Sequence, residues 1–122
     1  MAGTILVVDD NETNLRLINA VLKTRGYELL QAASGEAALE MLAAERPALV
    51  LMDVQMPGLS GVDVARMIRA MPALADLPLI AITAMAMKGD REQILAAGFN
   101  DYLAKPYKMG DLLSLVARWL PA

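Results

Sequence analysis

Short apolar runs alternate with helical patterns along the whole chain, and this alternation restricts the possible folds more than any other feature. The clearest runs, residues 5–8, 49–52 and 79–82, are nearly unbroken, as strands buried on both faces of a parallel sheet require. Two weaker runs, 29–33 and 102–104, are typical of strands at sheet edges or partly open to solvent. The sequence therefore predicts five strands.

The segments between these runs are predicted to be helices, because their apolar residues recur at spacings of three and four and so share one face. This pattern is carried by Leu15, Ile18, Leu22, Ala38, Met41, Leu42, Val64, Met67, Ile68, Ile94, Leu95, Ala97, Leu112, Leu113, Val116 and Leu120. Gly26 and Gly98 follow helical patterns, where a left-handed residue commonly ends a helix. Ser34 and Ser60 are predicted N-caps.

The resulting order, βαβαβαβαβα, predicts an α/β fold with an open parallel sheet, helices on both faces and right-handed crossovers. The length of 122 residues is typical of one domain, and we expect a single domain over residues 1–122. The sequence contains no internal repeat, low-complexity tract or linker. We therefore expect no separate output domain.

Composition excludes several kinds of chemistry and of partner. The chain has no histidine and no cysteine, so it lacks the usual general base and every thiolate ligand or nucleophile. Its net charge is -3 and its basic residues form no cluster, which disfavours direct nucleic-acid binding. No apolar run is long enough to predict a membrane span, and the N-terminus lacks the basic region of a signal peptide. We expect a cytoplasmic protein.

Polar residues follow the predicted strands at the edge where ligands bind in such sheets, beyond the carboxyl ends of the strands. Asp9 and Asp10 follow the first run and Asp53 follows the third. Thr83 ends the fourth run, and Lys105 comes directly after the fifth. The topology therefore predicts that three carboxylates, a hydroxyl and an amine converge at one rim.

Three neighbouring carboxylates repel one another, so either their pKa values rise or a cation neutralises them. Oxygen ligands alone favour Mg²⁺, with Mn²⁺ as the alternative, over zinc or copper. An aspartate beside such a metal can attack a phosphoryl group, and a lysine ammonium can stabilise the transferring oxygens. Lys105 is predicted to supply that ammonium.

Four ordered motifs resemble those of the response-regulator receiver family, whose members are similar to CheY. They are ILVVDDN at 5–11, LMDVQMPGLSG at 51–61, ITA at 82–84, and the dipeptide Lys105-Pro106. The likeness extends over residues 4–119, and the segment AMAMKGD at 84–90 is similar to DivK-type single-domain regulators and to receivers of hybrid histidine kinases. The resemblance implies a flavodoxin-like, doubly wound (βα)5 three-layer sandwich with strand order 2-1-3-4-5.

The resemblance also implies roles for the acidic residues and their neighbour. Asp53 matches the phosphoacceptor. Asp10 matches a direct metal ligand, and Asp9 matches an acid that holds the metal through water. Asp53 and the backbone carbonyl of Gln55 match the remaining protein ligands.

Further residues match the phosphoryl-binding and switching groups of the family. Thr83 matches the hydroxyl that moves to the phosphoryl oxygen, with Ala84 beside it, and Lys105 matches the lysine that binds the phosphoryl group. Tyr102 matches an aromatic rotamer switch, although an ordinary strand aromatic would give the same sequence signal. The Lys105–Pro106 peptide bond is implied to be cis.

The methionines after the fourth run allow two interpretations. Met85 is apolar where many receivers carry a polar residue that, with the residue at Gln55, influences hydrolysis of the phosphoryl group. Met85 and Met87 either form an adaptable surface for a partner or pack beneath their loop.

The function implied is that of a phosphorylation-dependent signalling switch in a two-component or phosphorelay system, rather than a conventional enzyme. Since the chain has no histidine, its donor is a histidine kinase, a histidine phosphotransferase or a small phosphodonor. Phosphorylation would alter the face formed by the last two helices and the fifth strand. The downstream target would be a protein, and for a DivK-type regulator it could be a kinase. We expect a monomer or a phosphorylation-dependent dimer.

Three other kinds of protein are alternatives to this interpretation. A flavodoxin-like cofactor binder needs a phosphate-binding loop after its first strand, where Asp9, Asp10 and Glu12 would repel a phosphate. An aspartyl-phosphate phosphatase needs its nucleophile after the first strand and a substrate cap. No such cap is apparent in a chain of 122 residues. A degenerate receiver would bind proteins without being phosphorylated, and only experiment separates it from the switch.

Overall fold

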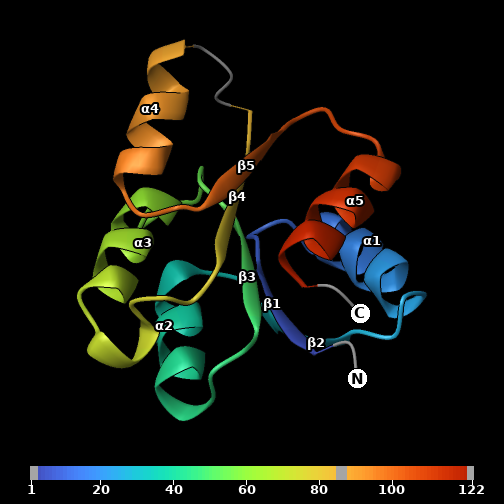
Figure 1. The fold of residues 1–122 in the computed structure, drawn as a ribbon, viewed down its shortest axis with the longest axis horizontal. Coiled ribbons are helices and arrows are strands. Elements are labelled where there is room, and N and C mark those ends of the chain that lie inside the picture. Colours follow the sequence, from blue (N-terminus) through green and yellow to red (C-terminus); the bar gives the residue numbers. More distant parts are fainter. Residues whose placement is uncertain (1–2, 85–87, 121–122) are drawn as a thin grey trace.

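The computed structural model describes residues 3–84 and 88–120 and has the alternating order that the sequence predicts (Figure 1). The elements are β1 (Thr4–Val8), α1 (Glu12–Lys23), β2 (Glu28–Ala32), α2 (Gly35–Ala44), β3 (Leu49–Asp53), α3 (Gly61–Arg69), the 3₁₀ helix η1 (Pro72–Leu74), β4 (Leu79–Thr83), α4 (Lys88–Ala96), β5 (Asp101–Ala104) and α5 (Met109–Trp119). The sequence did not predict η1. Within the described ranges, no helix is both long and apolar enough to cross a membrane.

The sheet has five parallel strands in the order β2-β1-β3-β4-β5. Helices α1 and α5 cover one face, and α2, α3 and α4 cover the other (Figure 1). Chain progression reverses between β1 and β3, which is the position where doubly wound sheets bind ligands. The predicted flavodoxin-like three-layer fold is confirmed.

Each face of the sheet contributes to its own apolar core. Strands β1, β3 and β4 are central and buried along nearly their whole length, whereas the edge strands β2 and β5 are partly exposed, as their weaker apolar runs predict. Successive β1 residues alternate between the two cores, Leu6 and Val8 facing one and Ile5 and Val7 the other. The sheet therefore gives the site above it a rigid base.

The predicted helix boundaries are confirmed by their caps. The side chains of Ser34 and Ser60 accept hydrogen bonds from backbone N–H groups of the first turns of α2 and α3. Gly26 and Gly98 have φ values of +85° and +116°, in the left-handed region that favours glycine. Asn11 caps α1 in the same way, which the sequence analysis did not predict.

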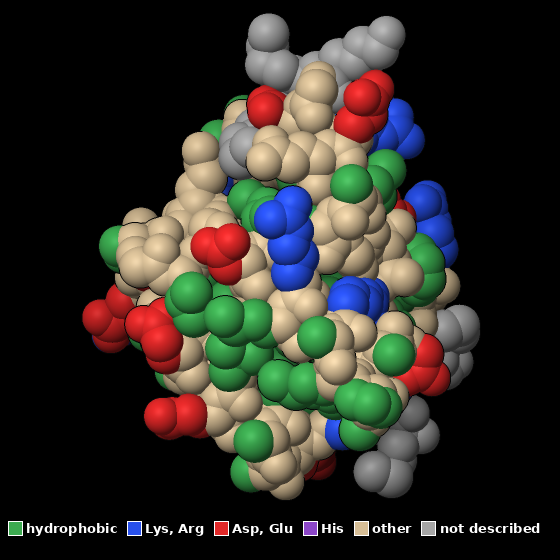
Figure 2. Space-filling view, turned by 90° about the vertical axis from the view of Figure 1, so that its left-hand side faces the viewer, with side chains coloured by type: hydrophobic (Ala, Val, Ile, Leu, Met, Phe, Trp, Pro, Cys, Tyr) green, Lys and Arg blue, Asp and Glu red, His purple; other side chains and the backbone are tan. Residues whose placement is uncertain are grey.

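Two residues assigned to apolar helix faces lie at the surface instead. Met67 of α3 is 42% exposed and Leu95 of α4 is 40% exposed. Each is next in sequence to a fully buried isoleucine, Ile68 or Ile94, and consecutive helical residues point about 100° apart. Met67 and Leu95 therefore lie at the margins of the apolar stripes. Figure 2 views the molecule from the side of α2, α3 and α4 and shows apolar side chains at the surface there.

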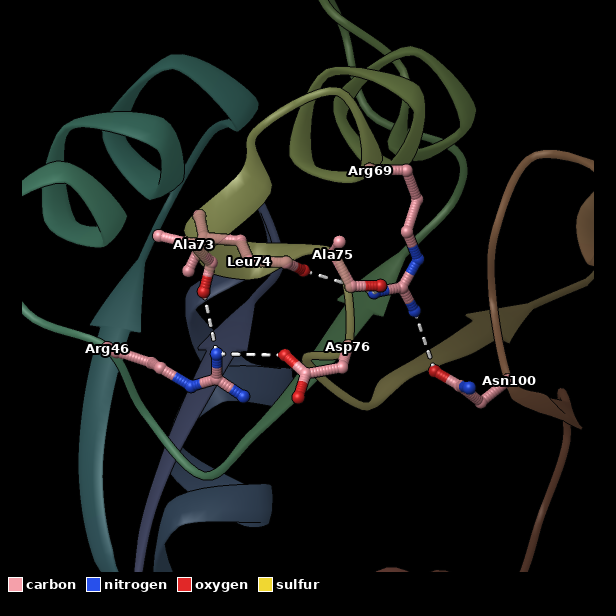
Figure 3. A network of polar contacts seen from close by, with 7 residues as sticks. All are labelled: Arg46, Arg69, Ala73, Leu74, Ala75, Asp76 and Asn100. Carbon is pink, nitrogen blue, oxygen red and sulfur yellow. Dashed lines mark hydrogen bonds and ion pairs between the residues drawn. The ribbon is translucent and has the colours of Figure 1, made fainter.

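Arg69, the last residue of α3, ties together the segments before β4 and β5 (Figure 3). Its Nε donates to the carbonyl of Gly98 at 2.9 Å, and its Nη2 donates to Oδ1 of Asn100 at 2.7 Å. Its Nη1 donates to the carbonyls of Leu74 and Ala75 at 3.3 and 3.1 Å. This network fixes the edge of the sheet opposite the candidate site.

Candidate functional site

Three carboxylates meet at the carboxyl edge of the sheet, as the topology predicts. Asp9 and Asp10 follow β1, and Asp53 is the last residue of β3. Strands β1 and β3 pair in register up to Val8 and Met52, so they end side by side. One oxygen from each carboxylate lies within 4.8 Å of the other two. Asp9 and Asp53 are buried and Asp10 is exposed.

Asp9 is held by two hydrogen bonds from the start of α1. Its Oδ1 accepts from the backbone N–H of Asn11 at 2.8 Å, and its Oδ2 accepts from Nδ2 of Asn14 at 3.3 Å. Burial and the negative charge of Asp53 both raise the pKa of Asp9, burial the more strongly. The hydrogen bond from Asn11 lowers it. The net effect is a raised pKa, which marks a buried negative charge that lacks sufficient compensation.

Asn14 was not identified from the sequence. The signal that could have found it is its place in the first turn of a helix that begins directly after the acidic pair. Because Asn11 caps this helix and accepts from the backbone N–H of Asn14, the first turn is fixed relative to Asp9. The side chain of Asn14 is thereby brought within reach of the carboxylate.

Each oxygen of Asp53 has a donor of its own. Oδ1 accepts from the backbone N–H of Gln55 at 2.9 Å, and Oδ2 lies 3.2 Å from Nζ of Lys105. The side chain of Asp53 is 7% exposed and that of Lys105 is 29% exposed, so the pair is only partly screened by water. The side chain of Gln55 points to solvent, and its backbone is what borders Asp53.

Gly61 allows the segment after β3 to pass close to Asp53. Its N–H donates to the carbonyl of Val54 at 2.9 Å. A Cβ at this position would lie 2.7 Å from the backbone oxygen of Asp53 and 2.7 Å from Cα of Val54. Any larger residue would therefore displace the backbone that carries Asp53.

Thr83 and Lys105 are placed by the pairing of β4 with β5. Thr83 is the last residue of β4, is fully buried and pairs with Ala104. The backbone N–H of Lys105 donates to the carbonyl of Thr83 at 2.7 Å. Because β4 lies between β3 and β5, Thr83 ends between Asp53 and Lys105 in the order of the sheet. Ala84 follows Thr83 and is exposed.

Tyr102 lies within β5 rather than at its end. The side chain is half-buried and packs with the core on the α4 side of the sheet. The guanidinium carbon of Arg91, from α4, lies 5.7 Å from the centroid of its ring. Met85 and Met87, for which the sequence left two interpretations open, fall outside the described residues.

An open cleft of about 470 Å³ lies beside Lys105. It is lined by Asn14, Ala84, Lys105, Pro106, Tyr107 and Met109. The Lys105–Pro106 peptide bond is cis. Burial raises the pKa of the Tyr107 hydroxyl, and the negative charges of Asp9 and Asp53 raise it further. Tyr107 and Met109 were not identified from the sequence, although Tyr107 is only two residues beyond Lys105.

The donor set is chemically uniform, and this limits what it can bind. Three carboxylates supply oxygen atoms alone, which suit a hard divalent cation such as Mg²⁺ or Mn²⁺. The ammonium group of Lys105, in contact with the carboxylate of Asp53, supplies a positive charge in addition to that of such a cation. Together they suit a phosphate-bearing ligand better than an apolar one.

Comparison with known proteins identifies the family. The sequence model of the response regulator receiver domain family matches residues 5–117 of this chain. The polar-differentiation response regulator DivK of Brucella anthropi is 35% identical over 120 residues, which cover 98% of each chain.

Solved structures of other receiver proteins share this fold. The receiver domain of sensor histidine kinase PA1611 from Pseudomonas aeruginosa PAO1, solved with magnesium in its active-site cleft, is 40% identical with a TM-score of 0.90 and complete coverage of both chains. The chemotaxis response regulator CheY4 of Vibrio cholerae is 26% identical with a TM-score of 0.93, covering 98% of this chain and all of its own. The chain therefore belongs to the response regulator receiver domain family, the phosphoaccepting signalling modules of two-component systems.

Proposed function

We propose that Asp53 is the phosphoacceptor of this receiver domain and takes its phosphoryl group from a phosphohistidine on a kinase or phosphotransferase. The observation that carries this proposal is the position of its carboxylate, which is nearly buried and fixed between the N–H of Gln55 and the ammonium of Lys105. A nucleophile already held in one orientation needs little reorganisation before it reacts. Asp9 and Asp10, in contrast, lack a contact with the lysine among the described hydrogen bonds.

The metal site of the proposal consists of the carboxylates of Asp9, Asp10 and Asp53, with the backbone carbonyl of Gln55 as a further ligand. The convergence of three carboxylate oxygens and the raised pKa of Asp9 both fit a site for Mg²⁺ or Mn²⁺. When bound, such a cation supplies positive charge that offsets the repulsion between the carboxylates and an incoming phosphoryl group.

The transfer itself is a substitution at phosphorus. A carboxylate oxygen of Asp53 forms a bond to the phosphorus as the phosphorus–nitrogen bond breaks, and the electron pair of that bond returns to the imidazole of the donor. Lys105, now paired with Asp53, would contact the phosphoryl oxygens after transfer. A donor side chain would approach this position through the open cleft beside Lys105, which Asn14 and Tyr107 also line.

Phosphorylation would then bias an equilibrium between two conformations. Thr83 and Ala84 would contact the phosphoryl oxygens as the segment after β4 moves inward, and Tyr102 would turn inward with it. The face formed by α4, β5 and α5 would change its affinity for a protein target, which could be a kinase. In this proposal the protein acts in the cytoplasm, as a monomer or a phosphorylation-dependent dimer, and is a switch rather than a conventional enzyme.

The proposal is tested by incubating the purified protein with acetyl phosphate and Mg²⁺ and measuring its intact mass. We expect the wild-type protein to gain one phosphoryl group and Asp53→Asn to gain none. Omitting the metal, or adding excess EDTA, should abolish the gain. No phosphorylation of the wild-type protein would indicate a degenerate receiver, and undiminished phosphorylation of Asp53→Asn would exclude Asp53 as the acceptor.

The donor is tested separately by incubation with phosphorylated histidine kinases and phosphotransferases from the host. Transfer from one of them within seconds, much faster than from the others, would identify the cognate donor. If acetyl phosphate labels Asp53 but no histidine donor does, the part of the proposal that names the donor is wrong.

A further inference from the structure

We propose that Arg91 of α4 is a positioning residue that holds Tyr102 in its half-buried arrangement and so sets how readily this receiver switches. The inference rests on the proposed function, in which Tyr102 turns inward as the phosphoryl group binds. It adds a residue that neither the sequence motifs nor the carboxylate site identifies.

The contact between the two residues is a cation–π interaction. The guanidinium carbon of Arg91 lies 5.7 Å from the centroid of the Tyr102 ring, within the range over which a cation is attracted to an aromatic face. Arg91 is exposed, and the ring is half-buried. The interaction therefore favours the present position of the ring over a more deeply buried one that would separate it from Arg91.

The backbone of Tyr102 is held independently of its side chain. Oδ1 of Asp101 accepts from the backbone N–H of Tyr102 at 2.9 Å, and Oδ2 of Asp101 accepts from Nε1 of Trp119 at 3.2 Å. Arg118 also reaches Oδ2 of Asp101, at 3.5 Å. These contacts anchor β5 to α5, so an inward turn of the ring would occur about its side-chain torsions.

Helix α4 is anchored at its other end. The carbonyl of Gly98 and the side chain of Asn100, which follow α4, are both bound by Arg69 of α3 (Figure 3). Arg91 lies near the start of α4, on the side of the segment that follows Thr83. The contact with Tyr102 is therefore made by the first turn of α4, away from the end that Arg69 binds.

The alternative is that Arg91 is an ordinary solvated side chain. The helix dipole disfavours a positive charge at the position of Arg91, because the N-terminal end of a helix favours negative charge. Among the contacts of the described residues, the one with the Tyr102 ring offsets this disadvantage. If Arg91 were only a solvated side chain, the effect of replacing it on phosphoryl binding would not depend on Tyr102.

The test is a double-mutant cycle that measures the affinity for beryllofluoride, a phosphoryl analogue, in the presence of Mg²⁺. If the contact opposes the switched state, Arg91→Gln should tighten beryllofluoride binding about two- to fivefold, the factor that an exposed cation–π contact provides. Arg91→Lys keeps a cation and should change the affinity less. In a Tyr102→Leu background, Arg91→Gln should bring no tightening.

Two controls separate this effect from others. Arg66→Gln removes the same charge from an exposed position on α3 and should not tighten binding, since loss of a positive charge by itself weakens anion binding. In the unliganded protein, the NMR resonances of the Tyr102 ring should shift in Arg91→Gln and change little in Arg66→Gln. The free energy of unfolding of each variant shows that the fold is kept.

Unchanged or weakened binding by Arg91→Gln would overturn the inference, and so would equal tightening in the Tyr102→Leu background. A wild-type protein that binds beryllofluoride but shows no effect of Arg91 would leave the proposed function standing and remove only this inference. A wild-type protein that neither binds beryllofluoride nor accepts a phosphoryl group would overturn both.

Discussion

Nζ of Lys105 lies 3.2 Å from Oδ2 of Asp53, although Lys105 follows β5 and Asp53 ends β3, and β4 separates these two strands. The contact spans the carboxyl edge of the sheet above Thr83, the last residue of β4. It places a positive charge beside a buried carboxylate whose other oxygen accepts from the backbone N–H of Gln55. Lys105 thus supplies a positive charge at a rim that also carries the carboxylates of Asp9 and Asp10, and the following predictions concern the residues around this rim.

Asn14 should strengthen metal binding without being an acidic ligand. Its side chain donates to Oδ2 of Asp9 at 3.3 Å and so orients a carboxylate of the proposed metal site. Loss of such an orienting partner typically weakens metal affinity by about tenfold or more. We expect Asn14→Ala to lower the affinity for Mg²⁺ on the order of tenfold in isothermal titration calorimetry.

Thr13→Ala is the matched control, because Thr13 is exposed in the same turn of α1. It should leave the Mg²⁺ affinity within about twofold of the wild-type value, as surface substitutions usually have small effects. Equal losses in both variants would show that the effect comes from the helix and that Asn14 does not orient Asp9.

The contribution of Asp9 to the free energy of unfolding of the metal-free protein should fall as pH rises. Burial holds the pKa of Asp9 above its ordinary value of 3.8, so the folded state binds this proton more tightly than the unfolded state does. The resulting stabilisation is complete below the unfolded pKa and is lost as pH rises through the raised folded pKa. Above that pKa, the charged carboxylate destabilises the metal-free fold.

Asp9→Asn should remove this contribution. In urea unfolding with EDTA, the free energy of unfolding of the wild-type protein minus that of Asp9→Asn should fall as pH rises from about 3.8 towards neutrality. Added Mg²⁺ should raise the stability of the wild-type protein more than that of the variant. A difference that stays constant, or rises with pH, is incompatible with a raised pKa at Asp9.

Gly61 and Gly110 should respond in opposite directions to the same substitution. A Cβ at Gly61 would lie 2.7 Å from the backbone of Asp53 and of Val54, whereas nothing lies within 4 Å of a Cβ at Gly110 in α5. We expect Gly61→Ala to lower the free energy of unfolding by about 1–3 kcal/mol and to slow phosphorylation by acetyl phosphate.

Gly110→Ala should raise the stability by up to about 1 kcal/mol, because alanine favours the helix, and should leave the phosphorylation rate unchanged. Both free energies come from urea unfolding, followed by circular dichroism. If Gly61→Ala were as stable as the wild-type protein and were phosphorylated as fast, the close approach of its backbone to Asp53 would matter neither for stability nor for phosphorylation.

The sequence was sufficient to predict the fold and the residues at the strand ends, for physical reasons. The unbroken apolar run of β3 requires burial on both faces, and the polar residue that ends it, Asp53, must then lie at the rim. The positions of Asn14 and Tyr107 depend on a helix cap and a loop path, which residue spacing does not specify. Met67 and Leu95 show the other limit, since periodicity does not mark where an apolar stripe ends.

The most direct test of the account identifies the residue that carries the phosphoryl group. The protein is phosphorylated with acetyl phosphate and Mg²⁺ and then reduced with borohydride, which converts an aspartyl phosphate to homoserine, and its peptides are analysed by mass spectrometry. The account predicts homoserine at position 53 and none at positions 9 or 10. Homoserine at position 9 or 10 with aspartate intact at 53, or a phosphoryl group on a hydroxyl side chain instead, would contradict it.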